Sequence, residues 1–385
     1  MDWFEKIKQN SDYFEQFRKK TIVCYGAGAK GRQSIQILKQ HGIDPVAVCD
    51  ANPELWGKTC EGVPILSYDE MQTKYNNYTI LLTCVLENAI SIRNYLLSRH
   101  ESNLIVFFSN PYKVETKVLT LDELVENKGL LDESYSLLED DESRKLFVNF
   151  LRWKMTGDIT ATAKKRNNCW LEVFDSDLIL ERHDYTYIDV GAYTGDSLIR
   201  FLAFCRGQYK KILCIEPDTT NFYELEKIVK NCRLQNVEIK NIGLWSTGAG
   251  KNFPFYSLNS ETAYESSNFF RDVNISLSNN VYKKTEQGGN QFCSIYTLDE
   301  SLRDFRENTL LLKIDTMGAE GEIVRGAKET LSESSPVLVM EYGTHSKYMS
   351  DLIPFIHENN SGYKFYLRQM YAYNNSRTFL YAIPR

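Results

Sequence analysis

The stretch IDVGAYTGDS, residues 188–197, decides the fold of the second half of this chain. It begins as an apolar strand that carries Asp189, continues through a turn with Gly191 and Gly195, and passes into helix-forming sequence at Asp196. Glycine has no Cβ, so the backbone of such a turn can approach a ligand closely. The stretch therefore predicts a strand, a binding loop and a helix of a doubly wound sheet, with these four residues at the binding edge.

The next predicted strand supplies acidic residues for the same edge. KILCIEPD, residues 211–218, ends in Glu216 and Asp218, about twenty residues after the glycine turn. A carboxylate at this position can accept two hydrogen bonds from the diol of a ribose. A glycine turn alone could reflect tight packing of a helix on a strand, but the turn together with Glu216 is typical of a nucleoside site. We therefore predict that Glu216 and Asp218 join the four residues above in a cofactor site.

Further apolar runs repeat the alternation of strand and helix. VEIKN, LLLKID and VLVMEY, which start at Val237, Leu310 and Val337, each predict a strand of the same sheet. At the C-terminus, YKFYLRQ and RTFLYAIP predict two strands that must be antiparallel because their link is short. The polar and aromatic stretch 245–291 has no strong period, and it predicts a hairpin and a loop over the site.

A second charged strand end lies in LLLKIDTMGAEGEIVRGAKETL, residues 310–331. The apolar strand ends in Lys313 and Asp315 before a helix begins, and doubly wound sheets bind their ligands at this end of the strands. Asp315 could instead cap the N-terminus of that helix, because aspartate is a preferred N-cap residue. Both explanations remain open from the residues alone.

Taken together, these pieces resemble the FkbM-type S-adenosylmethionine-dependent methyltransferases. The resemblance extends from about Asp175 to the C-terminus, and it is carried by IDVGAYTGDS, IEPDTTNFYELEKIVKNC, NVEIKNIGLWS, YTLDES, KIDTMGAEGEIVRGAKETL and YLRQMYAYNNSRTFLYAIP. It implies a class I methyltransferase fold in which Asp189 and the glycine turn hold the methionine end of the cofactor and Glu216 holds its ribose. It also implies that Asp315 lies near the sulfonium and the acceptor. Such proteins are linked to O-methylation of sugars, polysaccharides or secondary metabolites.

Two departures from the family pattern lie toward the acceptor. Met317 stands where a glutamate or glutamine is usual, and Gln369 and Met370 replace a histidine and aromatic pair after YLR. The resemblance therefore implies cofactor binding more directly than it implies a particular acceptor.

Methyl transfer needs few catalytic groups, because much of the acceleration can come from aligning the acceptor with the methyl group while one base takes the hydroxyl proton. The candidate bases are Asp315, Glu341 and His345. VLVMEYGTHS places Glu341 at a strand end and His345 in the loop beyond it. A histidine in a loop is often only a solvated surface residue, and this alternative stays open for His345.

The first 110 or so residues contain another strand, turn and helix pattern. TIVCY is followed by GAGAKG, with Gly26, Gly28 and Gly31, and PVAVCD then ends in Asp50. This order matches the dinucleotide fingerprint in outline, with a helix N-terminus for a pyrophosphate and Asp50 for a ribose. YTILLTC, LIVFF and the helix-like ENAISIRNYLLSRH complete a small parallel sheet. Three uses are open: a site for a nucleotide-linked acceptor, a regulatory NAD site, and a domain that only packs.

Composition limits the classes of partner. The net charge is −6, so the chain lacks the excess of basic residues that drives binding to nucleic acid. No apolar run is long enough to span a bilayer, and the start has no apolar signal region, so we expect no membrane partner and a cytoplasmic protein. The nine cysteines form no CxxC pair and the five histidines are scattered, so no metal site is indicated.

The sequence thus predicts an α/β protein with two Rossmann-like doubly wound sheets joined by a helical segment. The predicted parts are a nucleotide-binding-type domain over 1–112, a helical connector over 113–182 and a methyltransferase domain over 183–385. The expected function is O-methylation of a small-molecule or carbohydrate-like acceptor, with a possible nucleotide or nucleotide-sugar at the N-terminal domain. One alternative is an NAD-dependent oxidoreductase, which leaves the second nucleoside edge unexplained. A cofactor-binding scaffold without turnover is the other, and Met317 keeps it open.

Overall fold

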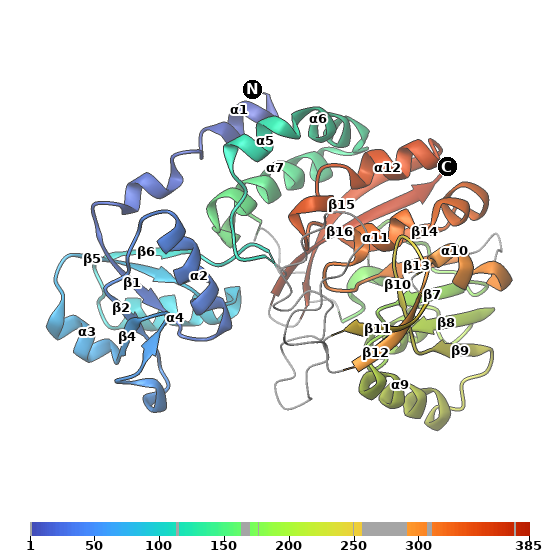
Figure 1. Cartoon of the computed structure of the whole chain (residues 1–385), viewed down its shortest axis with the longest axis horizontal. Helices are drawn as coiled ribbons and strands as arrows, with labels where there is room; N and C mark the ends of the chain where they lie inside the picture. The colour runs from blue at the N-terminus through green and yellow to red at the C-terminus, as the bar shows by residue number, and fades with distance from the viewer. Residues whose placement is uncertain are drawn as a thin grey trace. The chain divides into compact units, whose positions relative to one another are not determined.

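The computed structural model describes residues 2–112, 115–162, 170–175, 177–248, 250–255, 291–305, 310–372 and 375–385. The chain forms two compact units (Figure 1). The N-terminal unit comprises Met1–Gly129, Asp141–Asn168 and Gln369–Arg377, and the C-terminal unit comprises Leu130–Asp140, Cys169–Arg368 and Thr378–Arg385.

The N-terminal unit contains a six-stranded sheet of order β3-β4-β2-β1-β5-β6. β1 pairs in parallel with β2 on one side and with β5 on the other, as the sequence predicts. β3 and β4 form an antiparallel pair that the sequence analysis missed. The strands are β1 (Thr21–Tyr25), β2 (Ala47–Cys49), β3 (Thr59–Cys60), β4 (Val63–Leu66), β5 (Tyr78–Leu82) and β6 (Leu104–Phe107).

Both faces of this sheet are covered, because alternate residues of a strand point to opposite faces. Ile22 and Cys24 of β1 belong to one buried cluster, while Val23 and Tyr25 belong to another. The first cluster includes side chains of α2, and the second includes side chains of α3 and α4. The helices with residues in this unit are α1 (Trp3–Lys8), α2 (Ala29–Gln40), α3 (Tyr68–Lys74), α4 (Leu86–Ser98), α5 (Leu121–Glu126) and α7 (Asp141–Thr156).

The C-terminal unit is built on a seven-stranded sheet of order β15-β16-β14-β13-β7-β8-β9. β14, β13, β7, β8 and β9 are parallel, and β16 pairs antiparallel with β14. This is the predicted class I methyltransferase arrangement with a terminal strand pair. The strands are β7 (Thr186–Val190), β8 (Lys211–Ile215), β9 (Val237–Lys240), β13 (Leu310–Ile314), β14 (Val337–Glu341), β15 (Tyr363–Ala372) and β16 (Asn375–Pro384).

Helices pack on this sheet through apolar and aromatic side chains. The ring of Tyr187 in β7 stacks on that of Phe201 in α8, with 4.1 Å between the ring centroids. Both side chains are fully buried, and burial of aromatic area is a large stabilising contribution. The helices are α6 (Lys128–Leu137), α8 (Asp196–Phe204), α9 (Thr219–Asn231), α10 (Leu298–Ser301), α11 (Glu320–Arg325), the π-helix η7 (Thr330–Ser334), the 3₁₀ helix η8 (Ser346–Tyr348) and α12 (Leu352–Asn359).

A separate three-stranded sheet interrupts the alternation between β9 and β13. Its order is β10 (Ile242–Leu244), β12 (Gln291–Tyr296) and β11 (Gly250–Phe255). β11 and β12 are antiparallel, but only β11 and the first residue of β12 fall within the stretch 245–291 for which a hairpin was predicted, and β10 was not predicted. The rest of the stretch for which a hairpin and a loop over the site were predicted, 256–290, lies outside the described residues.

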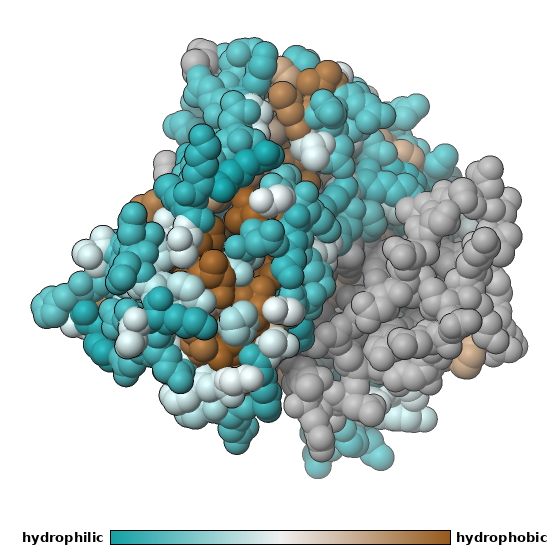
Figure 2. Space-filling model, turned by 60° about the vertical axis from the view of Figure 1, so that its left-hand side comes forward, coloured by the Kyte–Doolittle hydropathy of each residue, from teal (hydrophilic) through white to brown (hydrophobic). Residues whose placement is uncertain are grey.

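Figure 2 shows one face of the molecule on which hydrophilic residues predominate, with a group of hydrophobic residues among them. Within the part of the chain that the structure describes, no helix has the length and apolar character needed to cross a membrane.

Candidate functional site

The carboxyl ends of β7, β8, β13 and β14 carry most of the predicted site residues. Gly191, directly after β7, has φ +75°, and a Cβ on it would lie 2.1 Å from the backbone oxygen of Asp315. Gly195 has φ +95° and is the N-cap of α8. Side chains rarely adopt such angles, and the contact with Asp315 leaves no room for one. The glycine turn therefore brings the loop after β7 into direct backbone contact with the loop after β13.

Glu216 lies just beyond β8, and its carboxylate joins two loops. Oε2 accepts the backbone N–H of Tyr193 at 2.8 Å, and Oε1 accepts that of Asp218 at 3.0 Å. Burial raises the pKa of Glu216 to about 7, although these two N–H groups favour the ionised form. A carboxylate offers about four acceptor sites, and the two N–H groups and the side chain of Asn221 do not fill all of them. Glu216 keeps some acceptor capacity, and its contact with a ribose stays a prediction.

Asp189 is completely buried in β7 and paired with a lysine of β13. Lys313 Nζ lies 2.9 Å from Asp189 Oδ1, and the hydroxyl of Ser197 donates to Oδ2 at 2.7 Å. Burial disfavours the charge of Lys313, but neighbouring carboxylates, Asp189 first, raise its pKa above the ordinary value. The pair is ionic, and it joins β7 and β13 near their carboxyl ends.

Two other predicted cofactor residues make local structural contacts. Asp218 is the N-cap of α9, where its Oδ1 accepts the N–H groups of Thr220 and Asn221 at 2.8 and 3.0 Å. Asp196 Oδ2 receives Arg200 Nη1 at 2.8 Å, an i,i+4 ion pair on α8. Both carboxylates thus have partners within the chain. A role in cofactor binding stays a prediction for Asp196 and for Asp218.

Three carboxylates gather where β13 and β14 end. Asp315, Glu320 and Glu341 each have a carboxylate oxygen within 4.8 Å of the others. Such oxygens suit Mg²⁺ or Ca²⁺, but the carboxylate of Glu320 already accepts several hydrogen bonds. It accepts the N–H groups of Thr316 at 3.0 Å and Gly318 at 2.9 Å, and the hydroxyl of Thr344 at 2.6 Å. Burial first, and then the charge of Glu341, raises the pKa of Glu320.

Asp315 does not cap the helix that follows it. α11 begins at Glu320, and its N-cap is Ala319, which makes no side-chain cap. The N-cap explanation for Asp315 is therefore wrong, because a loop separates the strand from the helix. Met317 in this loop adopts φ +59°, a left-handed conformation that is uncommon for a residue with a side chain. Strained backbone of this kind clusters at functional sites.

The loop after β14 is fastened to α11. Tyr348 packs so closely that a Cβ on Gly321 would lie 2.2 Å from its ring, and its hydroxyl donates to Glu322 Oε1 at 2.6 Å. His345 is the N-cap of η8, with Nδ1 accepting the N–H of Lys347 at 3.1 Å. These contacts stabilise the conformation of the loop, and the Nδ1 atom of His345 takes part in them as a hydrogen-bond acceptor.

Asp50 of the N-terminal unit repeats the contact made by Glu216. Its Oδ2 accepts the N–H of Ala27, inside the predicted glycine turn, at 2.8 Å. Gly26 has φ +112° and Gly28 is the N-cap of α2. The structure therefore brings all four residues predicted for an N-terminal nucleotide site, including Gly31, to the start of α2 or beside it.

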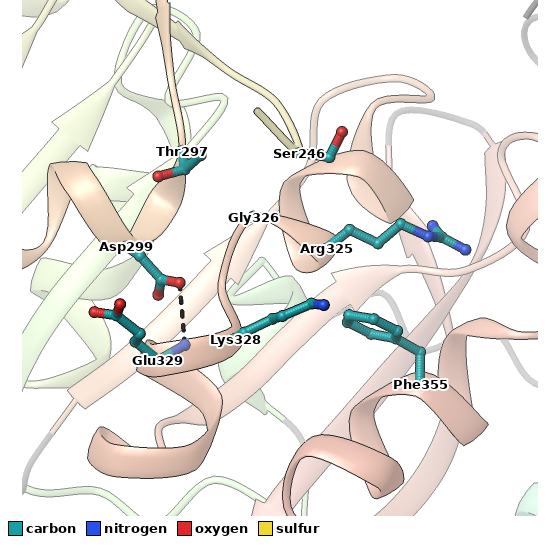
Figure 3. Close-up of a pocket in the computed structure, with 8 residues that line it drawn as sticks. All are labelled: Ser246, Thr297, Asp299, Arg325, Gly326, Lys328, Glu329 and Phe355. Atoms are coloured by element: carbon teal, nitrogen blue, oxygen red, sulfur yellow. Dashed lines mark hydrogen bonds between the residues drawn. The ribbon is translucent and has the colours of Figure 1, made fainter. Parts of the chain in front are cut away.

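A hollow of about 620 Å³ lies elsewhere in the C-terminal unit, between α10, α11 and α12 (Figure 3). Asp299 accepts the backbone N–H of Glu329 there at 3.0 Å, and the guanidinium of Arg325 lies 5.6 Å from the ring centre of Phe355. It contains none of the predicted site residues. Its lining residues are Ser246, Thr297, Asp299, Arg325, Gly326, Lys328, Glu329 and Phe355.

The sequence did not predict the residues whose contacts hold together the loops at the carboxyl ends of β7, β13 and β14. Lys313 was noticed only as a charge at a strand end, and neither Glu320 nor Glu322 was singled out. A signal existed for Lys313, since a lysine inside an apolar strand needs a buried partner. The roles of Glu320 and Glu322 depend on loops from β14, which the sequence does not bring together by itself.

Comparisons with known proteins agree with this geometry. A family model described as the methyltransferase FkbM domain matches residues 189–365. The crystal structure of methyltransferase FkbM from Methylobacillus flagellatus KT is similar over 99% of this chain and 95% of its own, with a TM-score of 0.68 at 16% identity. No curated protein matches the chain.

Two further solved structures match smaller parts of the chain with low TM-scores. Precorrin-6y C5,15-methyltransferase from Geobacter metallireducens GS-15 is 14% identical over 52% of this chain and 81% of its own, with a TM-score of 0.31. UDP-D-quinovosamine 4-dehydrogenase from Vibrio fischeri is 21% identical over 29% of this chain and 86% of its own, with a TM-score of 0.19. The family match identifies residues 189–365 as a methyltransferase FkbM domain, and the full-length structural match shows a shared fold.

Proposed function

We propose that the protein transfers a methyl group from S-adenosylmethionine to a hydroxyl of a carbohydrate-like acceptor. The observation that carries this proposal is the carboxylate group of Asp315, Glu320 and Glu341, at the ends of strands that neighbour the cofactor edge. A hydroxyl needs a base to lose its proton during transfer, and carboxylates can fill that role.

The residues of the cofactor edge fit the cofactor. Glu216 keeps acceptor capacity for the ribose, and the glycine turn after β7 offers a backbone surface without side chains. Lys313 and Ser197 hold Asp189 beneath that turn. When bound, S-adenosylmethionine supplies an electrophilic methyl group on its sulfonium.

Asp315 and Glu341 are the bases that we favour. Both lie where the loops after β13 and β14 meet, and Glu320 fixes those loops through Thr316, Gly318 and Thr344. Three carboxylates this close repel one another when ionised, so a proton taken from the acceptor relieves that repulsion. Glu320 acts as a positioning residue, because its oxygens are already bonded to both loops.

A carbohydrate acceptor is supported by the same chemistry. Ionised carboxylates accept hydrogen bonds from hydroxyl groups, and sugars offer several of them. The family resemblance, with its links to O-methylation of sugars, points in the same direction. We also propose that the N-terminal unit holds a nucleotide, on the basis of Asp50 and the glycine turn before α2.

The test of the methyl-transfer proposal is Asp315→Asn. The amide keeps the shape of the side chain and loses the proton acceptor, so turnover should fall by about 10²–10⁴ while cofactor affinity changes little. The measurement is transfer of a labelled methyl group to a panel of sugars and nucleotide-sugars, with calorimetry of S-adenosylhomocysteine binding in parallel.

His345→Asn is the matched control. Asparagine also caps helices, so this variant keeps the contact with Lys347 and removes only the imidazole. We expect it to stay active. Normal turnover in Asp315→Asn would refute Asp315 as the base and leave Glu341 for the same test. A protein that binds S-adenosylhomocysteine but methylates no acceptor would favour the scaffold alternative, and reduction of NAD by a panel member would favour the oxidoreductase.

A further inference from the structure

Tyr193, in the turn between β7 and α8, has a backbone conformation that a tyrosine rarely adopts. Its φ is +48°, in the left-handed region, where the Cβ of an L-residue comes too close to the following carbonyl oxygen. Glycine or asparagine adopts this conformation at a lower cost in free energy. The backbone of the turn therefore does not favour a tyrosine, and the benefit of this residue comes from its side chain.

That side chain contributes little to the packing of the C-terminal unit. Tyr193 is 41% exposed. Within the described part of the chain, its ring stacks on no other aromatic side chain and its hydroxyl has no hydrogen-bond partner. The ring of Tyr187 in the preceding strand, by contrast, is buried and stacked on Phe201. Strained backbone that internal packing does not offset is typical of a functional position.

The contacts of the turn place Tyr193 between the two parts of the site that a methyl donor joins. Gly191, in the same turn, lies against the backbone oxygen of Asp315, a favoured base. Glu216, the predicted ribose contact, accepts the backbone N–H of Tyr193 at 2.8 Å. In S-adenosylmethionine the sulfur is bonded to C5′ of the ribose and carries the methyl group. A ribose at Glu216 and an acceptor at Asp315 therefore bring the sulfonium next to this turn.

The surroundings of the phenol favour a cation. Burial first, and then three nearby carboxylates, raise the pKa of Tyr193, so its ring is neutral at physiological pH. These carboxylates belong to Asp196, Glu216 and Asp218. The face of an aromatic ring carries negative partial charge and attracts cations such as quaternary ammonium groups. A sulfonium is a cation of the same kind, since its charge is surrounded by carbon.

We propose that the ring of Tyr193 lies against the sulfonium of bound S-adenosylmethionine and favours this charged donor over S-adenosylhomocysteine, the neutral product. Transfer of the methyl group leaves an uncharged thioether, so the attraction between ring and cation is lost while the ribose, adenine and amino-acid parts of the ligand are unchanged. The ring thus favours binding of the donor and release of the product. The inference rests on the proposed methyl transfer from S-adenosylmethionine.

The test is calorimetry of the full-length protein with S-adenosylmethionine and, separately, with S-adenosylhomocysteine. The quantity compared is the Kd for the product divided by the Kd for the donor. Tyr193→Leu keeps an apolar side chain but removes the aromatic ring, so this ratio should fall about five- to thirtyfold, the range expected for loss of a cation–π contact. Tyr193→Phe keeps the ring, and its ratio should stay within about threefold of that of the unaltered protein.

Two further variants separate this role from a contribution to folding. Tyr209→Leu is the matched control, because Tyr209 precedes β8 at the opposite end from Glu216 and its hydroxyl donates to Gln235 O at 2.8 Å. This variant should leave the ratio unchanged even if it is less stable. Tyr193→Asn removes the ring and suits the left-handed backbone, so it should lower the ratio without lowering the melting temperature.

The outcomes distinguish this inference from the proposed function. Absence of binding by both compounds, in a folded and unaltered protein, would overturn the proposed methyl transfer. Binding of both compounds with the same ratio in Tyr193→Leu as in the unaltered protein would overturn the role of the ring and leave methyl transfer standing. A lowered melting temperature in Tyr193→Asn, with an unchanged ratio, would assign the ring to the fold instead.

Discussion

The raised pKa of Glu216 predicts that cofactor affinity changes with pH in a range where most carboxylates do not titrate. Only the ionised carboxylate accepts both ribose hydroxyls while still accepting the N–H groups of Tyr193 and Asp218. With a pKa of about 7, roughly a tenth of the free protein is ionised at pH 6 and nine-tenths at pH 8. The Kd for S-adenosylhomocysteine should therefore rise about tenfold from pH 8 to pH 6, because only the competent fraction binds.

The stability of the ligand-free protein should change in the opposite direction. Burial raises the pKa of Glu216 from 4.5 to about 7, so the native state holds this proton more tightly than the unfolded chain does. The contribution of Glu216 to the free energy of unfolding is therefore fully present below pH 4.5, and it falls by about 1.4 kcal/mol per pH unit up to pH 7.

The assay is calorimetry with S-adenosylhomocysteine at pH 6, 7 and 8. Repeating the pH 7 titration in buffers of different ionisation enthalpy should show release of about half a proton on binding. Glu216→Gln, checked for folding by its melting temperature, should bind more weakly and with no pH dependence in this range. A flat affinity in the unaltered protein, or the same slope in Glu216→Gln, would refute the assignment of the ribose contact to Glu216.

Two further predictions test the charges around the site. Lys313→Met should lower the free energy of unfolding, measured by urea denaturation, by about 3–5 kcal/mol, because it leaves Asp189 as an unpaired buried charge. Combining Lys313→Met with Asp189→Leu should recover most of that loss. No recovery would show that loss of the ion pair is not the cause. Treatment with EDTA should leave methyl transfer unchanged, because Glu320 already binds Thr316, Gly318 and Thr344; activity lost with EDTA and restored by Mg²⁺ would assign the three carboxylates to a metal ion.

The sequence predicted those features that depend on local pattern. Apolar runs predicted β7, β8 and β14, and because these strands are parallel, Asp189, Glu216 and Glu341 lie at or next to the same edge of the sheet. β3 and β4 were missed because strands of two and four residues give too short a pattern.

Contacts between distant segments were not predictable in the same way. The sequence suggested that Asp196 and Asp218 bind cofactor, but whether a carboxylate caps a helix or faces a ligand depends on where neighbouring donors lie. Glu320 was missed because its partner Thr344 comes from the loop after β14, which is distant in sequence. The charge of Lys313 is visible in the sequence, but its pairing with Asp189 exists only once β7 and β13 are adjacent.

The missing side chain of Gly191 has a consequence for protein engineering. A Cβ there would lie 2.1 Å from Asp315 O, so the loop after β7 and the loop after β13 meet through their backbones, without a side chain between them. A chimera that takes these two loops from different enzymes changes both sides of a contact that no rotamer can adjust. Grafts meant to redirect such an enzyme to a new substrate should therefore transfer both loops as one block.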